Sequence, residues 1–384
     1  MDVVLVILLL FLANKLFLTS LAKKHAFFDK SLIFKVFLYH LLFCFIYYLY
    51  ASFNPSDSKH YYFVATLRKD DWMGLFETGT NFINFLAVPF IELGLSYESL
   101  MLVFSWFGYV GFVYAYLFFK ENITTPIKIF GNVDFLTLLL FLPNMHFWSV
   151  SLGKGSVIFM GIMMFMYAIK KPKQRLHLLL IASFFVYMVR PHIMFFLLTS
   201  VCVGILFGKE RISQTTKALV IIASVSFLIA ASNSILSIVN LENSQDVFSD
   251  FEAFATVRAT ELSKAGSGLD INSYPLPLKL FTFWFRPLFI DAPSIVGLFS
   301  SVENLMYLLI FFKACNMGFL KYLKSSPFLV KASFIAFLSV SFAMTFITSN
   351  LGIIMRQKAM VMYFGFFVIF SYLVYRREQR LKAV

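Results

Sequence analysis

The chain has 384 residues, of which 60% are hydrophobic, 19% aromatic and only 14% charged. Soluble domains are roughly 45–50% apolar and about 25% charged, so this composition excludes a water-soluble globule, a disordered chain and a nucleic-acid-binding protein. The sequence predicts a membrane protein, and its net charge of +13 has to be interpreted by position along the chain. Its 3 cysteines form no C-x-x-C pair, which excludes a disulfide framework and a thiolate metal site.

Apolar runs long enough to cross a membrane recur along the whole chain. A crossing helix needs about 20 apolar residues, or about 17 when its end residues snorkel. We therefore predict an all-α polytopic protein with a single transmembrane domain, 1–384, and about eleven transmembrane helices. The predicted spans are 3–19, 32–52, 99–119, 129–146, 155–169, 177–190, 192–208, 217–238, 294–313, 327–348 and 359–375. The first run lacks a basic leader and a small-residue cleavage site, so we expect it to be retained as a helix.

Two further apolar pieces are too broken to span. Thr80 to Leu95 contains Pro89, and Leu276 to Ile290 contains two prolines. We expect each to be an interfacial or re-entrant helical segment, because such backbone is tolerated only where protein or trapped water satisfies it. They belong to two predicted outer loops, 53–98 and 239–293.

The second outer loop also carries an amphipathic pattern. Apolar residues recur there at helical spacing, at Phe248, Phe251, Phe254 and Val257. This pattern predicts a helix on the outer face. A lid over a substrate and a passive interfacial helix would have the same sequence.

The basic residues predict the orientation of the chain. If the spans alternate from an outer N-terminus, 22 of the 33 Lys and Arg residues fall on the cytoplasmic side, as the positive-inside rule requires, and the C-terminus is cytoplasmic. The cytoplasmic loops are short and contain no glycine-rich phosphate loop. We therefore expect no nucleotide chemistry there, and we place the candidate functional residues on the outer side.

Three arginines lie at outer ends of predicted spans: Arg190, Arg286 and Arg356. Each guanidinium offers a planar fork of donors that matches two phosphate oxygens, so a group of them predicts a pyrophosphate site. An isolated arginine such as Arg190 is interpreted equally well as a side chain that snorkels to lipid phosphate. Lys154 is either a fourth member of the group or a solvated loop cation.

The candidate catalytic residues are Asp57 and His60, directly after the second span. Either side chain could accept a proton from an attacking hydroxyl. Alternatively, Asp57 simply caps a helix that begins near Tyr61. Tyr61 and Trp148 offer ring faces to sugars, or belong to an interfacial aromatic belt. Asp70, Asp71 and Glu77 could bind a divalent cation or simply solvate their loop, but they form no recognised metal loop, so we predict no metal site and no cofactor.

The order of short motifs resembles a family, the EpsG/Wzy-like bacterial polysaccharide polymerases. The resemblance covers most of the chain from about Asn54 to Lys358. The motifs are Asp57-Ser-x-x-Tyr-Tyr62, Phe76-Glu-Thr-Gly79, Gly94-Leu-Ser-Tyr97, Pro143 to Lys154, Arg190-Pro-His192, Phe285-Arg-Pro287 and Asn350-x-Gly-x-x-x-Arg356. Members of such families join oligosaccharides carried on undecaprenyl pyrophosphate at the outer face of the bacterial inner membrane. A looser similarity is to membrane glycosyltransferases of the C-type fold.

The resemblance implies a role for each candidate residue. Arg190, Arg286 and Arg356 would contact pyrophosphate or glycan, and Asp57 or His60 would activate the acceptor. The last motif departs from expectation, because Lys358 stands where a second arginine is expected, and as a pyrophosphate or glycan ligand it would replace that arginine only weakly. The implied partners are lipid-linked oligosaccharide, membrane lipids and other polysaccharide-assembly proteins, with no nucleic acid.

Two other classes of function remain open. A transporter or flippase of lipid-linked glycans would also use outer arginines, but it needs ionisable residues within its spans. Glu303, beside Asn304, is the clearest example, and it is also a potential partner for Arg286. A non-catalytic membrane scaffold predicts that every outer arginine is replaceable.

Overall fold

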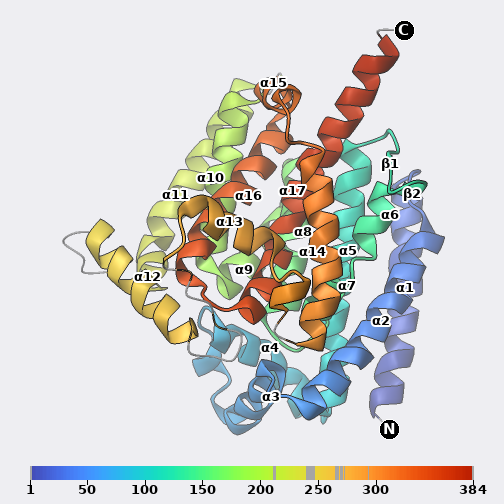
Figure 1. The fold of residues 1–384 in the computed structure, drawn as a ribbon. Helices are drawn as coiled ribbons and strands as arrows, with labels where there is room; N and C mark the ends of the chain where they lie inside the picture. The colour runs from blue at the N-terminus through green and yellow to red at the C-terminus, as the bar shows by residue number, and fades with distance from the viewer. Residues whose placement is uncertain are drawn as a thin grey trace. The chain divides into compact units, whose positions relative to one another are not determined.

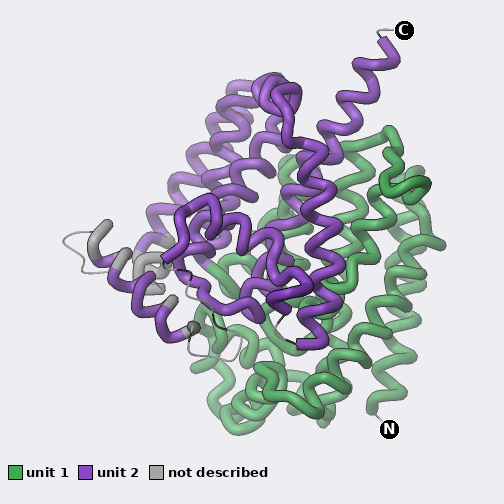
Figure 2. Tube along the Cα trace, viewed as in Figure 1, with its two compact units in different colours: residues 1–190 green, residues 191–384 purple. Residues whose placement is uncertain are grey.

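The computed structural model describes residues 2–210, 213–238, 247–263, 268, 271, 273–292 and 294–382. Residues 239–246, the start of the second predicted outer loop, lie outside the described residues, as do 264–267, 269–270, 272 and 293 later in that loop. The chain forms two compact units, residues 1–190 and 191–384, which Figure 2 distinguishes by colour. Each unit is considered by itself below.

Unit 1 consists of helices apart from one short hairpin (Figure 1). Its elements are α1 (Asp2–Lys24), α2 (Lys30–Phe53), α3 (Asp57–Leu67), the 3-10 turns η1 (Lys69–Asp71) and η2 (Met73–Leu75), α4 (Thr80–Glu92), α5 (Tyr97–Asn122), β1 (Lys128–Ile129), β2 (Val133–Asp134), α6 (Phe135–Leu140), α7 (Pro143–Ser149), α8 (Lys154–Ile169) and α9 (Leu176–Val189). The two strands pair antiparallel, with Lys128 opposite Asp134.

Unit 2 is helical as well, and its strand content in the described residues is a single isolated bridge between Gly268 and Asn350. Its elements are α10 (Pro191–Phe207), α11 (Gln214–Ile238), α12 (Val247–Ser263), α13 (Leu276–Phe285), η3 (Phe289–Asp291), α14 (Ile295–Phe312), α15 (Met317–Ser325), α16 (Phe328–Ile347) and α17 (Leu351–Lys382). Helix α16 packs against both α10 and α17.

The helices identify a multi-pass membrane protein of the all-α class. Within the described residues, 6 helices are long and apolar enough to cross a bilayer, and the shorter apolar helices are Phe135–Ser149, α8, α9, α10, part of α11 and α13. Large apolar side chains stay exposed along the long helices, including Leu8 (62%) and Phe45 (57%). Such surfaces suit lipid rather than water, and a helix satisfies its own backbone hydrogen bonds there.

The predicted span 129–146 is not one continuous helix, because its first residues belong to a hairpin and the others to two short helices. Gly131, at φ +87, permits the tight turn between the strands. Asp134 then accepts a hydrogen bond from the Thr137 N–H and caps α6. Pro143 occupies the first turn of α7, where its missing N–H costs nothing. Hydropathy alone could not reveal these interruptions.

The segments predicted to be interfacial or re-entrant form helices. Thr80–Glu92 forms the 13-residue helix α4 with Pro89 inside it, and Leu276–Phe285 forms the 10-residue helix α13. Helix α12 occupies Val247–Ser263 in the second loop and packs against α16. The sequence suggested a loop at 350–358 and a span that begins at 359. In the structure the last helix, α17, already begins at Leu351, so Arg356 and Lys358 lie on its first turns.

Close packing in unit 1 depends on glycines of α5. A Cβ on Gly108 would lie 1.9 Å from the Ser149 carbonyl oxygen, and one on Gly111 would lie 2.5 Å from the Phe159 ring. Both sites therefore exclude any larger residue, and they allow α5 to approach α7 and α8 closely. Small residues serve this purpose between helices in membranes, where packing rather than water drives association.

A buried ion pair joins α5 to the segment before α9. Arg175 is 5% exposed and donates to both carboxylate oxygens of Glu121, at 2.8 and 2.9 Å. Its guanidinium also lies 3.7 Å from the centre of the Tyr167 ring. The Lys171 ammonium approaches the same carboxylate at 2.7 Å. These basic residues, which the sequence suggested to be topology signals, thus also hold unit 1 together.

Candidate functional site

Asp57 and His60 lie on α3, and both side chains are exposed. The helix begins at Asp57, and its cap is Ser56, whose hydroxyl accepts from the Ser58 N–H at 3.3 Å. The alternative that Asp57 caps a helix starting near Tyr61 is therefore wrong. Residues three apart on a helix share a face, so Asp57 and His60 present a carboxylate and an imidazole side by side.

A chain of hydroxyl groups fixes the start of α3. Tyr47 bonds Ser56 at 3.0 Å, Ser56 bonds Ser58 at 2.8 Å, and Ser58 bonds Tyr97 at 2.6 Å. The Tyr62 ring also packs against the Tyr97 ring, with their centres 5.8 Å apart. The motif at 57–62 is thereby bound to the motif at 94–97, and the position of Asp57 and His60 is set by α2 and α5.

The start of α8 brings together a second group of motif residues. Tyr61 is buried, and a Cβ on Gly153 would lie 3.3 Å from its ring. Gly155 passes so close to the Trp148 carbonyl oxygen that a Cβ there would lie 2.2 Å from it. The Trp148 indole donates to Asn144 at 3.0 Å. The turn from α7 into α8 is therefore compact, and Lys154 is the first residue of the helix that follows.

The loop before α4 meets the start of α8 and the end of α9. The Gly79 N–H donates to the Met188 carbonyl at 2.7 Å, and a Cβ on Gly79 would lie 3.8 Å from Lys154 Nζ. Gly79 has φ +84, a conformation that side chains other than glycine rarely adopt. Arg190 follows Met188 by two residues and is half-buried, with its Nε shielded from solvent. We call Tyr61, Gly79, Lys154, Met188 and Arg190 the Lys154 cluster.

The Lys154 cluster has the chemistry of an anion site. The first N–H groups of α8 lack partners within the helix, and the helix dipole adds partial positive charge at the same end. The Lys154 ammonium lies at this end, where helix energetics alone would favour a negative side chain. A phosphate group could be bound by both the helix N-terminus and the ammonium.

Unit 2 contains a second polar group, around Lys358. This lysine is 0% exposed, and its ammonium donates to the Arg286 carbonyl at 2.7 Å, to the Asn304 side chain at 2.8 Å and, more weakly, to the Trp284 carbonyl at 3.5 Å. Two of these acceptors lie at the C-terminal end of α13, where carbonyls have no partner within the helix. The lysine thus caps α13, and the helix dipole favours a cation there.

Acidic side chains balance the charge of this second group. The Arg286 guanidinium pairs with Asp291, whose carboxylate also accepts from the Leu288 N–H at 2.5 Å. Glu303 is buried and accepts a hydrogen bond from the Tyr307 hydroxyl. We call Trp284, Arg286, Asp291, Asn304 and Lys358 the Lys358 cluster. Both of its cations, Arg286 and Lys358, have partners within this cluster.

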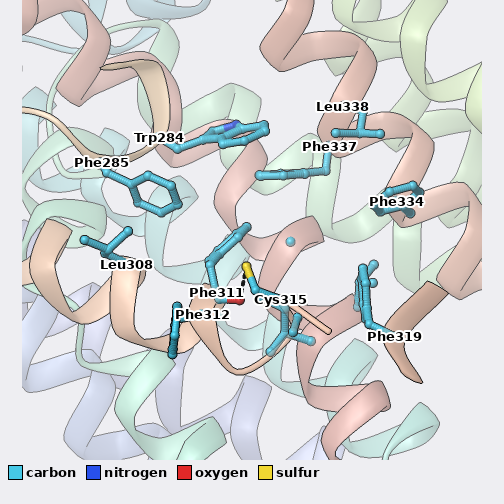
Figure 3. A pocket seen from close by; sticks show the side chains of 14 residues that line it. Trp284, Phe285, Leu308, Phe311, Phe312, Cys315, Phe319, Phe334, Phe337 and Leu338 are labelled. Atoms are coloured by element: carbon cyan, nitrogen blue, oxygen red, sulfur yellow. Dashed lines mark hydrogen bonds between the residues drawn. The ribbon is translucent and has the colours of Figure 1, made fainter. Parts of the chain in front are cut away.

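An apolar cavity of about 340 Å³ lies beside the Lys358 cluster (Figure 3). Trp284 belongs to both, because its carbonyl faces Lys358 while its ring lines the cavity and stacks on Phe337 with centres 5.0 Å apart. Phe311, Phe319 and Phe334 also line it. Such a lining offers contacts to a hydrocarbon chain and few to a sugar.

The structure separates the predicted residues into two sets. Asp57, His60, Tyr61, Trp148, Lys154 and Arg190 belong to unit 1, whereas Arg286, Arg356 and Lys358 belong to unit 2. Arg356 is half-buried on α17, and it points away from Lys358 because residues two apart on a helix face different directions. Sequence reasoning missed Gly79, Asp291 and Asn304 as partners of these cations. For Gly79, its place directly before the apolar run at 80–92 was a signal that the sequence offered.

Among the described residues, no group of three or more His, Cys, Asp or Glu side chains could hold a metal ion. No family model, curated protein or solved structure matches the chain. The geometry of the two clusters is therefore the basis for the functional proposal.

Proposed function

We propose that the chain is a membrane glycosyltransferase of the polysaccharide-polymerase type, which joins oligosaccharide units carried on undecaprenyl pyrophosphate. The proposal includes the outer face of a bacterial inner membrane as the place of reaction, an outer N-terminus and about eleven crossings with α4 and α13 as interfacial or re-entrant pieces. It rests on the resemblance to EpsG/Wzy-like polymerases.

The observation that carries the proposal is the convergence of separate motifs. Residues 57–62, 76–79, 148–154 and 188–190 lie far apart in the sequence, yet Tyr61 contacts Gly153, Lys154 approaches Gly79, and Gly79 bonds Met188. In unit 2 the Phe285-Arg-Pro motif meets the 350–358 motif through Lys358. Residues of a functional site are expected to converge in this way.

The proposed reaction assigns the pyrophosphate to the Lys154 cluster. Lys154 and Arg190 would neutralise the lipid pyrophosphate as the bond between the anomeric carbon and the phosphate oxygen breaks. Asp57 or His60 would accept the proton of the acceptor hydroxyl as its oxygen bonds that carbon. Tyr61 is buried, so it would support the Lys154 cluster by packing rather than contact a sugar. Trp148 remains the candidate for sugar stacking.

The test is synthesis with purified protein and lipid-linked oligosaccharide from the native host. Wild-type protein should produce a ladder of longer lipid-linked products on a gel. Lys154→Ala and Arg190→Ala should lose the ladder, whereas Lys173→Ala, an exposed lysine between α8 and α9, should retain it. Asp57→Asn and His60→Gln identify the base, since both residues are exposed and neither change should disturb folding. A ladder unchanged in all four variants would refute the proposal.

A second candidate function is transport of lipid-linked glycans. Its specific support is the pair Glu303 and Lys358, two ionisable side chains buried on helices α14 and α17, which pack against one another. Buried ionisable residues within membrane helices commonly serve ion or proton coupling. A transporter would move labelled lipid-linked oligosaccharide across proteoliposome membranes without forming longer products. A scaffold would do neither.

A further inference from the structure

His40 of α2 and His146 of α7 form a buried pair in unit 1, and neither residue has a part in the proposed reaction. The two rings are 1% and 0% exposed, and their Nδ1 atoms lie 2.8 Å apart. The Nε2 of His40 lies 3.0 Å from the Ser105 carbonyl oxygen, and that of His146 lies 2.8 Å from the Leu140 carbonyl oxygen. Every ring nitrogen of the pair is therefore within hydrogen-bond distance of a partner.

The number of protons that this geometry requires can be counted. A carbonyl oxygen only accepts, so both Nε2 atoms must carry a hydrogen. The Nδ1–Nδ1 contact needs one hydrogen between the two nitrogens. Three hydrogens are thus required, whereas two neutral imidazoles carry two. Any neutral tautomer leaves two lone pairs facing each other at hydrogen-bond distance.

We propose that His40 and His146 together form a binding site for a single proton, held between their Nδ1 atoms. The pair then carries one positive charge shared by α2 and α7. On loss of that proton the facing lone pairs repel, so the contact between the two helices weakens. Since α7 leads directly into the turn that carries Lys154, occupancy of the proton site is coupled to the position of the Lys154 cluster.

The surroundings of the pair contain no competing charge. Tyr39 and Cys44 of α2 and Tyr109 of α5 are the titratable neighbours; the Tyr39 hydroxyl donates to the Phe141 carbonyl, and that of Tyr109 donates to Asn14. From α5, the Phe112 ring lies parallel to His146 with centres 3.9 Å apart. Helix α8 contributes Phe159, which packs on Phe112. No Asp, Glu, Lys or Arg side chain of the described residues bonds to either imidazole. Ring faces of this kind stabilise a cation without accepting its proton.

The test is nitrogen NMR of the full-length chain in lipid nanodiscs, with ring-labelled ¹⁵N-histidine, titrated between about pH 4.5 and about pH 8 around the ordinary histidine pKa. The expected result is a scalar coupling between two Nδ1 nuclei across an N–H···N bond, together with three protonated nitrogens in the pair. This coupling should disappear at high pH in a single step.

Variants assign the signals. His146→Asn places an amide N–H near the former Nδ1 position and should abolish both the coupling and the step, as should His40→Asn. His177→Asn, which changes an exposed histidine, should leave both unchanged. The wild-type spectra decide the question even if a variant fails to fold. Absence of the coupling at every pH, or two protonated nitrogens throughout, would overturn the proposal.

Discussion

The Lys358 ammonium donates to the Arg286 backbone carbonyl at 2.7 Å, so the side chain of one motif residue binds the main chain of another. The arginine's own guanidinium is engaged elsewhere, with Asp291. Lys358 therefore stabilises the C-terminal end of α13, and Arg286 stabilises the turn that follows. Both basic residues were predicted as phosphate ligands, and the structure also gives each a role in the architecture of unit 2.

Replacement of Lys358 by methionine should destabilise unit 2. The change leaves the carbonyls of Trp284 and Arg286 and the amide oxygen of Asn304 without their shared donor. At about 0.6 kcal/mol for each hydrogen bond within a membrane, the expected loss is about 2 kcal/mol. Thermal unfolding in nanodiscs measures it, with Lys324→Met at an exposed site of α15 as the control. Equal melting temperatures for the two variants would contradict the capping role.

The predicted orientation can be tested with a native cysteine. Cys315 is exposed between α14 and α15, while Cys44 is buried. The positive-inside pattern predicts that Cys315 faces the cytoplasm. A membrane-impermeant maleimide should therefore label it in inverted vesicles and not in spheroplasts, and Cys315→Ser should remove the label. Lys59→Cys on exposed α3, in a Cys315→Ser background, should show the opposite behaviour. Labelling of Cys315 in spheroplasts would show that the orientation is opposite to the predicted one.

Stability should depend on pH through His25, which lies in the link between α1 and α2. Burial, and then the positive charge of Arg175, lowers the pKa of His25 below its usual 6.5. The folded state therefore binds fewer protons than the unfolded state, so this contribution is complete above about pH 6.5 and is lost as the pH falls below that value.

The partner of His25 suggests the matched variant. Its Nε2 lies 3.0 Å from the Tyr167 hydroxyl, and glutamine places an amide near the same position but does not titrate. The melting temperature of wild type should fall between about pH 7.5 and about pH 5 by more than that of His25→Gln. His177→Gln, at an exposed site, should behave as wild type. Identical pH dependence in wild type and His25→Gln would exclude this contribution.

Hydropathy predicted most of the helices, because a helix in lipid needs a long apolar run. It did not predict where a helix is interrupted or where it begins, because these depend on backbone geometry. The run at 129–146 is mainly apolar, but the turn at Gly131 and the proline at 143 divide it. Lys358 and Arg356 interrupt the apolar pattern of α17, so the sequence suggested a loop there. The partners of Lys358 are mainly backbone carbonyls, which no side-chain pattern reveals.

For unit 1, the sequence could predict which kinds of residue form the candidate site, but not which of them lie close together. Arginine, lysine and carboxylate at outer span ends indicate anion chemistry, and that inference needs no coordinates. The proximity of Lys154 to Gly79, and of Gly79 to Met188, depends on how α4, α8 and α9 pack. Sequence separations of about seventy residues or more carry no such information without homologous sequences or a structure. The Arg175–Glu121 pair, whose residues are 54 apart in the sequence, was missed because it too depends on how the helices pack.

Two glycines provide the sharpest test of the Lys154 cluster. Gly79 and Gly94 both have positive φ, +84 and +80, and the ψ of −124 at Gly79 lies in a region that glycine alone readily adopts, so alanine is strained at both positions. A Cβ on Gly94 would meet nothing within 4 Å, whereas one on Gly79 would face Lys154 Nζ at 3.8 Å. The melting temperature of each variant measures how much its strain destabilises the fold, and activity is compared at a temperature at which both variants are folded. Polymer formation should fall at least tenfold in Gly79→Ala alone, because a shift of the loop that bonds Met188 displaces Lys154 and Arg190 from a common ligand, and misplacement by about 1 Å can cost about a hundredfold. Equal activity in Gly79→Ala and Gly94→Ala would show that this loop does not position the site.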